Sequence, residues 1–353
     1  MLVLGIESSC DETAAAVVED GVRVRSNVIA TQTDLHAEYA GVVPEIASRA
    51  HAERMLVVVR RALRDAGVGY GDIGAIAVGN RPGLIGSLLV GVSAAKALSW
   101  SLEIPLVGVD HVHAHLYAGW LDADPPRLPA LGLVVSGGHS SIYLVRSIER
   151  PERLGATIDD AVGEAFDKAA AILGIAYPGG PNLDRLASEA GADERKLELP
   201  ISRLAPESLD LSFSGLKTAL LYAVKGKPIP RRDGGGFERD GVELTHEQRR
   251  DFAASFQKAA VGAVVLKVQR ALAHVRERGI ECATLLVGGG VSANSRLRRE
   301  LAGLGEREGL DVRLPRLDLC VDNAAMIAGL GEVMLRAGVV DGLELEAVPT
   351  TGV

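Results

Sequence analysis

The chain contains one short pattern twice, and this repetition limits the folds it can adopt. The apolar run Leu2–Ile6 leads through the polar stretch ESSCDE into a second apolar run, Thr13–Val18. The same order returns where Leu131–Val135 leads through SGGH into Ser140–Val145. Aligned without gaps, Leu4, Gly5 and Ser9 fall opposite Leu131, Gly132 and Ser136. Two copies of a strand, a tight polar turn and a returning strand predict two related lobes.

Helical segments alternate with further strands between the two hairpins. Residues 44–67 and 87–101 read as helices, whereas 73–78 and 106–109 read as strands. This alternation predicts an α/β protein with mixed sheets. The sequence PPRLP at 125–129 is the expected linker, because proline interrupts regular structure. We expect an N-terminal lobe over 1–126, a C-terminal lobe over 127–326, a final helix over 327–353 that packs back on the first lobe, and a flexible insertion at 225–240.

Composition narrows the class of protein. The 353 residues are 47% apolar and include three cysteines far apart in the chain, which fits a packed protein of a reducing compartment. The N-terminus lacks a basic leader, and the uncharged stretch 84–95 is too short for a bilayer. We therefore expect a cytoplasmic protein without a membrane. With 38 basic and 46 acidic side chains the net charge is −8, so any nucleic-acid binding must be local or shared with partners.

Three histidines lie within the five residues HVHAH. On a helix His111 and His115 share one face, one turn apart, whereas His113 points to the other side. The pair can grip one metal ion, and the alternative is a polar helix face or hydrogen-bonded core histidines. Position 112 is Val112, so the glutamate base of a His-Glu-x-x-His peptidase is missing.

Several polar turns are candidates for ligand contacts. The SGGH turn offers backbone N–H groups and a hydroxyl to an anion, or is simply a structural turn. The apolar run 284–287 leads through three glycines into a helix near Ser292, an arrangement that often faces a nucleotide. Asp11 and Glu12 are either exposed turn residues or a proton acceptor and a water-mediated metal ligand. Asp322 follows an expected apolar strand, and there it can merely cap a helix.

Together these segments resemble one known family along nearly the whole chain. The carrying motifs, in order, are ESSCDETAAAVV, GVVPEIASRAH, PGLIGSLLVG, the pair His111 and His115, VSGGHSS, DDAVGEAFDKAA, YPGGPNLD, FSGLKTA, GGGVSANSRLR and DNAAMIA. The chain resembles the universal tRNA threonylcarbamoyladenosine transferases, formerly called O-sialoglycoprotein endopeptidases, and is most similar to their bacterial branch.

The resemblance implies an actin-like, sugar-kinase-like ATPase fold of two duplicated lobes with the ligand between them. It implies that His111, His115 and Asp322 bind one divalent metal ion, Fe²⁺ or alternatively Zn²⁺. The residues implied to bind the nucleotide-containing donor are Ser9, Val134, Val135, Ser136, Gly137, Gly138, His139, Asp167, Gly180, Asp184 and Asn294. Our hypothesis for the group that removes a proton is Asp11 or Glu12.

The implied reaction moves a threonylcarbamoyl group from threonylcarbamoyl-AMP to N6 of the adenosine next to the anticodon, in tRNAs that read codons beginning with A. The implied partners are a metal-free paralogue and a small P-loop ATPase. Rival interpretations are an ATP-dependent kinase or a non-catalytic nucleotide-binding subunit on the same fold. One departure from the family is Asn80-Arg81, where a glycine usually precedes Pro82, so the shape of that loop is an open question.

Overall fold

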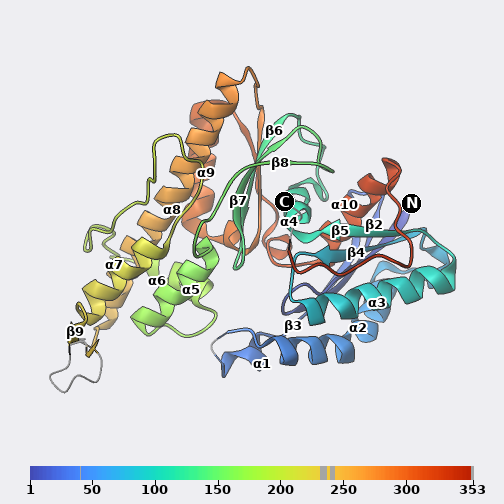
Figure 1. The fold of residues 1–353 in the computed structure, drawn as a ribbon, viewed down its shortest axis with the longest axis horizontal. Coiled ribbons are helices and arrows are strands. Elements are labelled where there is room, and N and C mark those ends of the chain that lie inside the picture. Colours follow the sequence, from blue (N-terminus) through green and yellow to red (C-terminus); the bar gives the residue numbers. More distant parts are fainter. Residues whose placement is uncertain (40, 231–236, 239–242, 351–353) are drawn as a thin grey trace.

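Two lobes with the same sheet topology make up the molecule (Figure 1). The computed structural model describes the chain except for residues 40, 231–236, 239–242 and 351–353. The first sheet has the strand order β3-β2-β1-β4-β5, and the second has β8-β7-β6-β11-β12. In each, an antiparallel run of three strands continues into two parallel strands. The α/β class and the duplication are therefore confirmed.

The strands of the two sheets are β1 (Leu2–Glu7), β2 (Glu12–Glu19), β3 (Arg23–Thr31), β4 (Ala75–Arg81), β5 (Leu106–Asp110), β6 (Ala130–Val135), β7 (Ser140–Val145), β8 (Glu152–Ala156), β11 (Thr284–Gly288) and β12 (Asp311–Arg313). The α-helices are α1 (Thr33–Ala37), α2 (Pro44–Ala66), α3 (Ile85–Leu102), α4 (His111–Tyr117), α5 (Val162–Leu173), α6 (Gly179–Ala187), α7 (Ser214–Lys225), α8 (His246–Glu277), α9 (Ser295–Glu308) and α10 (Ala324–Arg336).

Part of the predicted insertion at 225–240 lies outside the described residues, namely 231–236, 239 and 240. The described part holds two short paired strands, β9 (Ile229–Pro230) and β10 (Phe237–Glu238). Residues 125–129, the expected linker, belong to no helix or strand.

Strand β1 shows how the first lobe is layered. Leu4 and Ile6 belong to the core formed with α2 and α3, whereas Val3 packs in the core that contains α10. Alternate side chains of a strand point to opposite faces, so the strand serves both cores. A Cβ at Gly5 would lie 2.2 Å from the carbonyl oxygen of Ala324, so the glycine permits α10 to lie directly on the strand.

The last helix is shorter than the sequence predicts. Instead of filling 327–353, α10 ends at Arg336, and Gly338 follows with a φ of +85°, which glycine adopts readily. Helix α10 packs against β1, β2 and β4, so the end of the chain lies on the first lobe.

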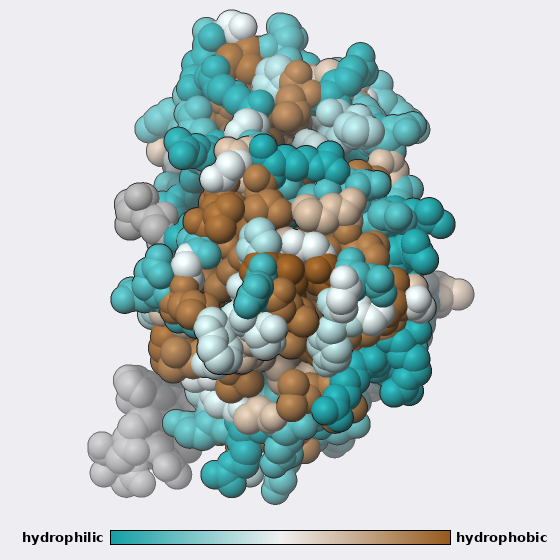
Figure 2. All heavy atoms as spheres, turned by 90° about the vertical axis from the view of Figure 1, so that its right-hand side faces the viewer, coloured by the Kyte–Doolittle hydropathy of each residue, from teal (hydrophilic) through white to brown (hydrophobic). Residues whose placement is uncertain are grey.

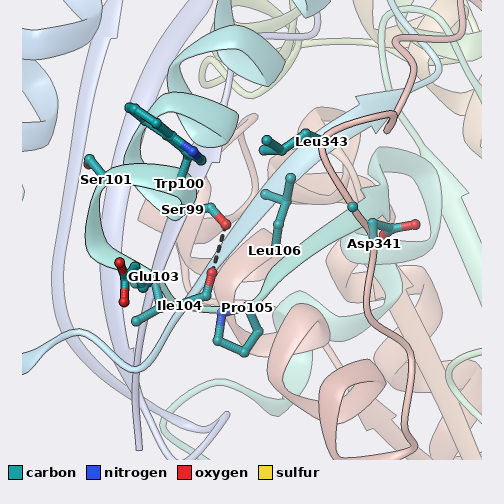
Figure 3. A pocket seen from close by; sticks show the side chains of 10 residues that line it. Ser99, Trp100, Ser101, Glu103, Ile104, Pro105, Leu106, Asp341 and Leu343 are labelled. Atoms are coloured by element: carbon teal, nitrogen blue, oxygen red, sulfur yellow. Dashed lines mark hydrogen bonds between the residues drawn. The ribbon is translucent and has the colours of Figure 1, made fainter.

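The segment after α10 crosses the first lobe as an irregular tail. The carboxylate of Asp341 accepts a 2.7 Å hydrogen bond from the N–H of Gly108 in β5. Asn80 Nδ2 donates to the carbonyl oxygen of Glu346 at 2.9 Å, and the Asn80 carbonyl accepts from the N–H of Val348. Asn80, two residues before Pro82, thus holds the tail. The tail and the end of α3 also border a cavity of about 740 Å³ that includes Trp100 (Figure 3).

Helix α3 is apolar on more than one side. Its length and mean hydropathy would suit a membrane span, although the uncharged stretch in it is short; here it packs on β4 and α2. Its exposed positions include Ile85, Leu89 and Trp100, with exposed fractions of 47%, 51% and 73%. Figure 2, which faces the first-lobe end of the molecule, shows apolar side chains gathered between hydrophilic margins.

Candidate functional site

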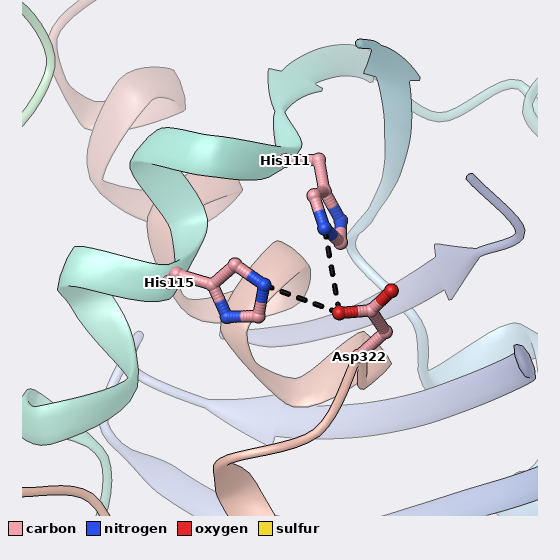
Figure 4. A group of neighbouring side chains, drawn as sticks. All are labelled: His111, His115 and Asp322. Carbon is pink, nitrogen blue, oxygen red and sulfur yellow. Dashed lines mark hydrogen bonds and ion pairs between the residues drawn. The ribbon is translucent and has the colours of Figure 1, made fainter. Parts of the chain in front are cut away.

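The three predicted metal ligands lie together between the lobes (Figure 4). His111 and His115 come from the first and second turns of α4, and Asp322 comes from the loop before α10. Asp322 Oδ1 lies 3.4 Å from His111 Nε2 and 3.1 Å from His115 Nε2. One ligand atom from each residue falls within 4.8 Å of the others. The group can therefore hold one metal ion.

The local sequence explains why these side chains are free to converge. The Asp110 carboxylate caps α4 by accepting from the N–H groups of Val112 and His113 at 3.0 and 3.1 Å. At the start of α10 the cap is Asn323 and not Asp322, and a short 3-10 helix over 317–319 stands where a strand was expected. The cap interpretation of Asp322 is therefore wrong, and its carboxylate is left to the histidines.

His113 points away from this group, as its position in the helix predicts. Its ring lies edge-on to Tyr143 with the ring centroids 5.7 Å apart, whereas the rings of His111 and His115 are 4.7 Å apart.

The two ligand histidines have different surroundings. Nδ1 of His111 lies 3.0 Å from Glu7 Oε2 and 3.2 Å from the hydroxyl of Ser9. Glu7 is fully buried, and a Cβ at Gly79 would lie 2.6 Å from Glu7 Oε2, so that glycine makes room for the carboxylate. Nδ1 of His115 is buried without a hydrogen-bond partner among the described residues. Glu7 thus fixes which nitrogen of His111 faces the group.

The charges in the group favour a bound cation. Burial lowers the pKa of His111, but the carboxylates of Asp322 and Glu7 raise it well above its ordinary value. Burial lowers the pKa of His115, and the charge of His111 lowers it further. Burial raises the pKa of Asp322, yet the two histidines hold it well below the usual range. Two imidazole nitrogens and an ionised carboxylate form a donor set that suits Fe²⁺ or Zn²⁺.

The SGGH turn lies beside the metal-ligand group and is tightly built. The N–H of Ser136 donates to the carbonyl of His139 at 2.7 Å, and the N–H of His139 donates to Ser136 Oγ at 3.1 Å. Helix α5 begins directly against it, because a Cβ at Gly163 would lie 2.6 Å from the Ser136 carbonyl oxygen. Burial, together with His111 and His115, lowers the pKa of His139 to about 4, so its imidazole is neutral at pH 7.

A cavity of about 330 Å³, the turn cavity, opens next to that turn. Its lining includes five of the residues predicted to bind the donor: Gly137, Asp167, Gly180, Asp184 and Asn294. Asp167 accepts from the N–H of Gly180 at 2.9 Å, and burial raises its pKa. Asp184 accepts from the N–H of Ser295 at 3.0 Å, and Asn294 caps α9. Both side chains therefore also hold the start of α9 in place.

The other residues predicted to bind the donor lie behind the lining of the turn cavity or beside it. Val134 and Val135 are fully buried in β6 and pack in the cores, so their side chains do not reach the cavity. Ser136 is buried in the turn, and Ser9 lies against His111. Gly138 and His139 belong to the turn but are not among the cavity's lining residues.

Asp11 and Glu12 lie on the first-lobe side, close to the metal-ligand group. Burial, Asp322 and Asp11 together raise the pKa of Glu12 well above its usual range, which favours the protonated form of this carboxyl. The hydrogen bond between the two acidic side chains adds to this shift.

Sequence reasoning missed several residues of the site. Glu7 closes a buried strand, and Phe166, Tyr177 and Val321 line the turn cavity. Val321 directly precedes Asp322, so one wall of the cavity is continuous with the metal-ligand group. A carboxylate at the carboxyl end of an apolar strand was a readable signal for Glu7, because ligands of α/β sheets bind at that edge.

Solved structures of low sequence identity share this fold. HypF from T. kodakarensis is 16% identical, with a TM-score of 0.59 over 95% of this chain and 48% of that one. Component A of the (R)-2-hydroxyglutaryl-CoA dehydratase of Acidaminococcus fermentans is 12% identical with a TM-score of 0.54 over 95% of this chain and 99% of that one. These similarities show the fold alone.

Sequence relatives show the family. The family model of tRNA N6-adenosine threonylcarbamoyltransferase matches residues 23–329. The proteins of that name from Trichlorobacter lovleyi and Dehalococcoides mccartyi are 48% and 46% identical, covering 99% and 100% of this chain and 96% and 99% of theirs. The chain that brings His111, His115 and Asp322 together beside the turn cavity belongs to the tRNA N6-adenosine threonylcarbamoyltransferase family.

Proposed function

We propose that the chain transfers the threonylcarbamoyl group of threonylcarbamoyl-AMP to N6 of the adenosine next to the anticodon, in tRNAs that read codons beginning with A. N6 bonds to the carbamoyl carbon, the bond from that carbon to the phosphate oxygen breaks, AMP leaves and N6 gives up one proton. The observation that carries this proposal is the continuity of the turn cavity with the metal-ligand group through Val321 and Asp322.

The chemistry requires an activated donor, because the lone pair of adenine N6 is delocalised into the ring. His111, His115 and Asp322 would hold the divalent ion, Fe²⁺ or alternatively Zn²⁺, which supplies Lewis acidity to donor oxygens when bound. Glu7 keeps the His111 ring oriented through Nδ1. The glycines of the SGGH turn let the backbone approach the donor, and the donor would fill the turn cavity.

Asp11 is the better candidate of the two acidic residues for accepting the N6 proton. Glu12 retains its own proton at neutral pH, because burial and the nearby Asp322 and Asp11 raise its pKa. A group that is already protonated cannot serve as a base. Glu12 instead donates a hydrogen bond within the pair and positions Asp11.

One assay tests the function. The purified chain, with its paralogue and P-loop ATPase partners, is incubated with threonylcarbamoyl-AMP and unmodified tRNA, with and without a chelator, and the nucleosides are analysed. We expect modified adenosine that disappears with the chelator. In Asp322→Ala and His115→Ala the product is lost, whereas His113→Ala, which removes a histidine of the same helix outside the group, retains it. No product from the complete wild-type mixture would overturn the proposal.

The same mixture separates the rival functions. A kinase would convert ATP to ADP without a need for the two histidines, and a non-catalytic subunit would bind nucleotide without turnover. The convergence of His111, His115 and Asp322 favours the transferase, since a kinase of this fold needs a catalytic aspartate and Mg²⁺ held by its nucleotide.

The exposed face of α3 suits the proposed paralogue partner. Ile85, Leu89, Ser93, Ala97 and Trp100 follow one another at helical spacing and are all exposed and uncharged. Leu89→Asp should abolish the complex in size-exclusion chromatography, whereas Arg299→Glu on the second lobe should not. With a net charge of −8, this chain would share its grip on tRNA with such partners in the cytoplasm.

A further inference from the structure

A second cavity, the interlobe cavity, lies against the turn cavity and has a volume of about 530 Å³. Gly137, Asp167 and Tyr177 line both cavities, so the two cavities adjoin at these residues. The first lobe contributes Gly41 and Val42 to the interlobe cavity, and α5 of the second lobe contributes much of the rest. It is therefore lined from both lobes.

One face of α5 lines the interlobe cavity. Glu164, Lys168 and Ala171 of α5 succeed one another at spacings of four and three residues, and Ile175 follows just after the helix; all four belong to the lining. Lys168 pairs with Glu164 at 2.8 Å and with Asp160 at 2.7 Å, so its charge is already balanced. These lining residues include no unpaired cation that could bind a phosphate. Their carboxylates can instead accept hydrogen bonds from the N–H groups of a neutral heterocycle.

Tyr177 occupies the shared wall. Burial, followed by the charges of Asp11, Asp167 and Glu12, raises the pKa of its phenol to about 12. These neighbours place the ring, which the second lobe supplies, next to the acidic turn of the first lobe. A ligand in the interlobe cavity would thus have an aromatic face beside it and Asp11 within the same neighbourhood.

We propose that the interlobe cavity receives the target adenine of the tRNA, extruded from the anticodon loop, with Tyr177 at the border that this cavity shares with the donor in the turn cavity. This inference rests on the proposed function and assigns its second substrate a place. Single-stranded bases are commonly bound by stacking on an aromatic ring and by hydrogen bonds to their edges. The carboxylates of Glu164 and Asp167 match the two N–H groups of N6, and the neutral ring avoids repulsion between these carboxylates and an anion.

The test fills the interlobe cavity without touching the turn cavity. Ala171 is an exposed residue of α5 that lines only the interlobe cavity, so Ala171→Trp obstructs it, and Ala302→Trp, at an exposed position of α9 outside both cavities, is the matched control. Single-turnover transfer is measured against tRNA concentration with the full chain and its partners, and AMP binding is measured by calorimetry. We expect half-saturation by tRNA to require at least tenfold more tRNA in Ala171→Trp, with the affinity for AMP within twofold of wild type and both values unchanged in Ala302→Trp.

A spectroscopic probe separates this inference from the proposed reaction. An anticodon stem-loop with 2-aminopurine in place of the base that stacks on the acceptor adenine should gain fluorescence on binding wild type, because the adenine leaves that stack, and should gain none with Ala171→Trp. This readout needs no transfer, so it can succeed even where the wild type forms no product. The inference would be overturned if wild type and Ala171→Trp needed the same tRNA concentration for half-saturation and gained the same fluorescence. It would also be overturned if Ala171→Trp weakened AMP binding as much as it weakened tRNA binding.

A second pair of variants guards against misfolding of the tryptophan variant. Tyr177→Phe keeps the aromatic face and should retain the fluorescence gain, whereas Tyr177→Leu should lose most of it. Full retention in Tyr177→Leu would contradict the role of the ring.

Discussion

Glu7 Oε2 lies 3.0 Å from Nδ1 of His111, and both side chains are buried. The second oxygen of Glu7 accepts the N–H of Ser9, so the carboxylate is held from two directions. A carboxylate that orients a ligand histidine raises its basicity and fixes its tautomer. The first strand of the chain is thereby tied to a histidine 104 residues away.

Replacing Glu7 should weaken metal binding more than it affects folding. In Glu7→Gln the amide no longer offers a charged acceptor to Nδ1, and we expect the affinity for Co²⁺ or Zn²⁺ to fall about 10- to 100-fold. Competition with a coloured chelator measures this affinity. Glu53→Gln, at an exposed position of α2, is the control and should bind as wild type does. Unchanged affinity in Glu7→Gln would show that His111 needs no carboxylate.

The contact between α5 and the SGGH turn predicts a steric effect. In Gly163→Ala the new methyl group would lie 2.6 Å from the Ser136 carbonyl oxygen and 2.9 Å from Gly137 Cα. We expect a loss of about 1–3 kcal/mol of the free energy of unfolding, as overpacked sites show, and weaker binding of AMP. Urea denaturation and calorimetry provide the two measurements.

Gly215→Ala is the matched control for that substitution. Gly215 lies in the first turn of α7, and a Cβ there would meet nothing within 4 Å. Alanine should leave AMP binding unchanged and stabilise the protein by about 0.5–1 kcal/mol. Equal behaviour of the two variants would argue against a close approach at Gly163.

His139 predicts a pH dependence of stability. Its pKa is lowered to about 4 in the fold by burial and by His111 and His115, whereas an unfolded histidine has its ordinary pKa of about 6.5. The unfolded state therefore binds more protons between these values, so the contribution of His139 is present above pH 6.5 and is lost as the pH falls toward 4. The shift corresponds to about 1–2 kcal/mol after allowance for partial exposure.

Urea unfolding between pH 7 and 4.5 measures this effect. The difference in unfolding free energy between wild type and His139→Gln should shrink as the pH falls. His274→Gln, at an exposed position of α8, should show no such trend. A difference that grows at low pH would reverse the sign of the predicted shift.

The two acidic turn residues should differ in their effect on transfer. Asp11→Asn removes the proposed base and should lower the single-turnover rate by about 100-fold or more. Glu12→Gln replaces a protonated carboxyl with another hydrogen-bond donor, so its rate should fall less. Quenched-flow assays at several pH values compare the two. A larger loss in Glu12→Gln would assign the base to Glu12.

Asn80 provides a test of the tail. Asn80→Gly removes the hydrogen bond that Nδ2 of Asn80 donates to the Glu346 carbonyl. We expect carboxypeptidase to shorten the C-terminal tail faster, with a loss of about 1 kcal/mol in unfolding free energy. An unchanged cleavage rate would show that Asp341 alone retains the tail.

Sequence reasoning was most successful where a local pattern determines a local structure. The two hairpins and the spacing of His111 and His115 predicted the duplicated sheets and the shared helix face. The approach of Asp322 to these histidines came only from the family resemblance, since no local pattern links residues so far apart. The length of α10 was overestimated because Gly338, with its positive φ, follows the end of the helix, and the residues after it run as an irregular tail.

Tertiary contacts account for the residues that were missed. Glu7 reads as the polar end of a strand, and only the return of α4 gives it a partner. Tyr177 reads as part of a rigid turn, and only the meeting of the lobes brings it near Asp11. Val134 and Val135 were expected at the ligand, yet they are successive residues of β6, so their side chains point to opposite faces of the sheet and enter different cores.

The position of α10 and the tail on β1, β4 and β5 has a consequence for biosynthesis. The second lobe is continuous in sequence from β6 to β12, so all its strands are synthesised before α10. The first lobe begins at the N-terminus but must wait for α10 to cover β1 and for Asp341 to join β5. The part of the protein synthesised first is thus completed last, and a nascent chain stalled before residue 324 would display an uncovered sheet to chaperones.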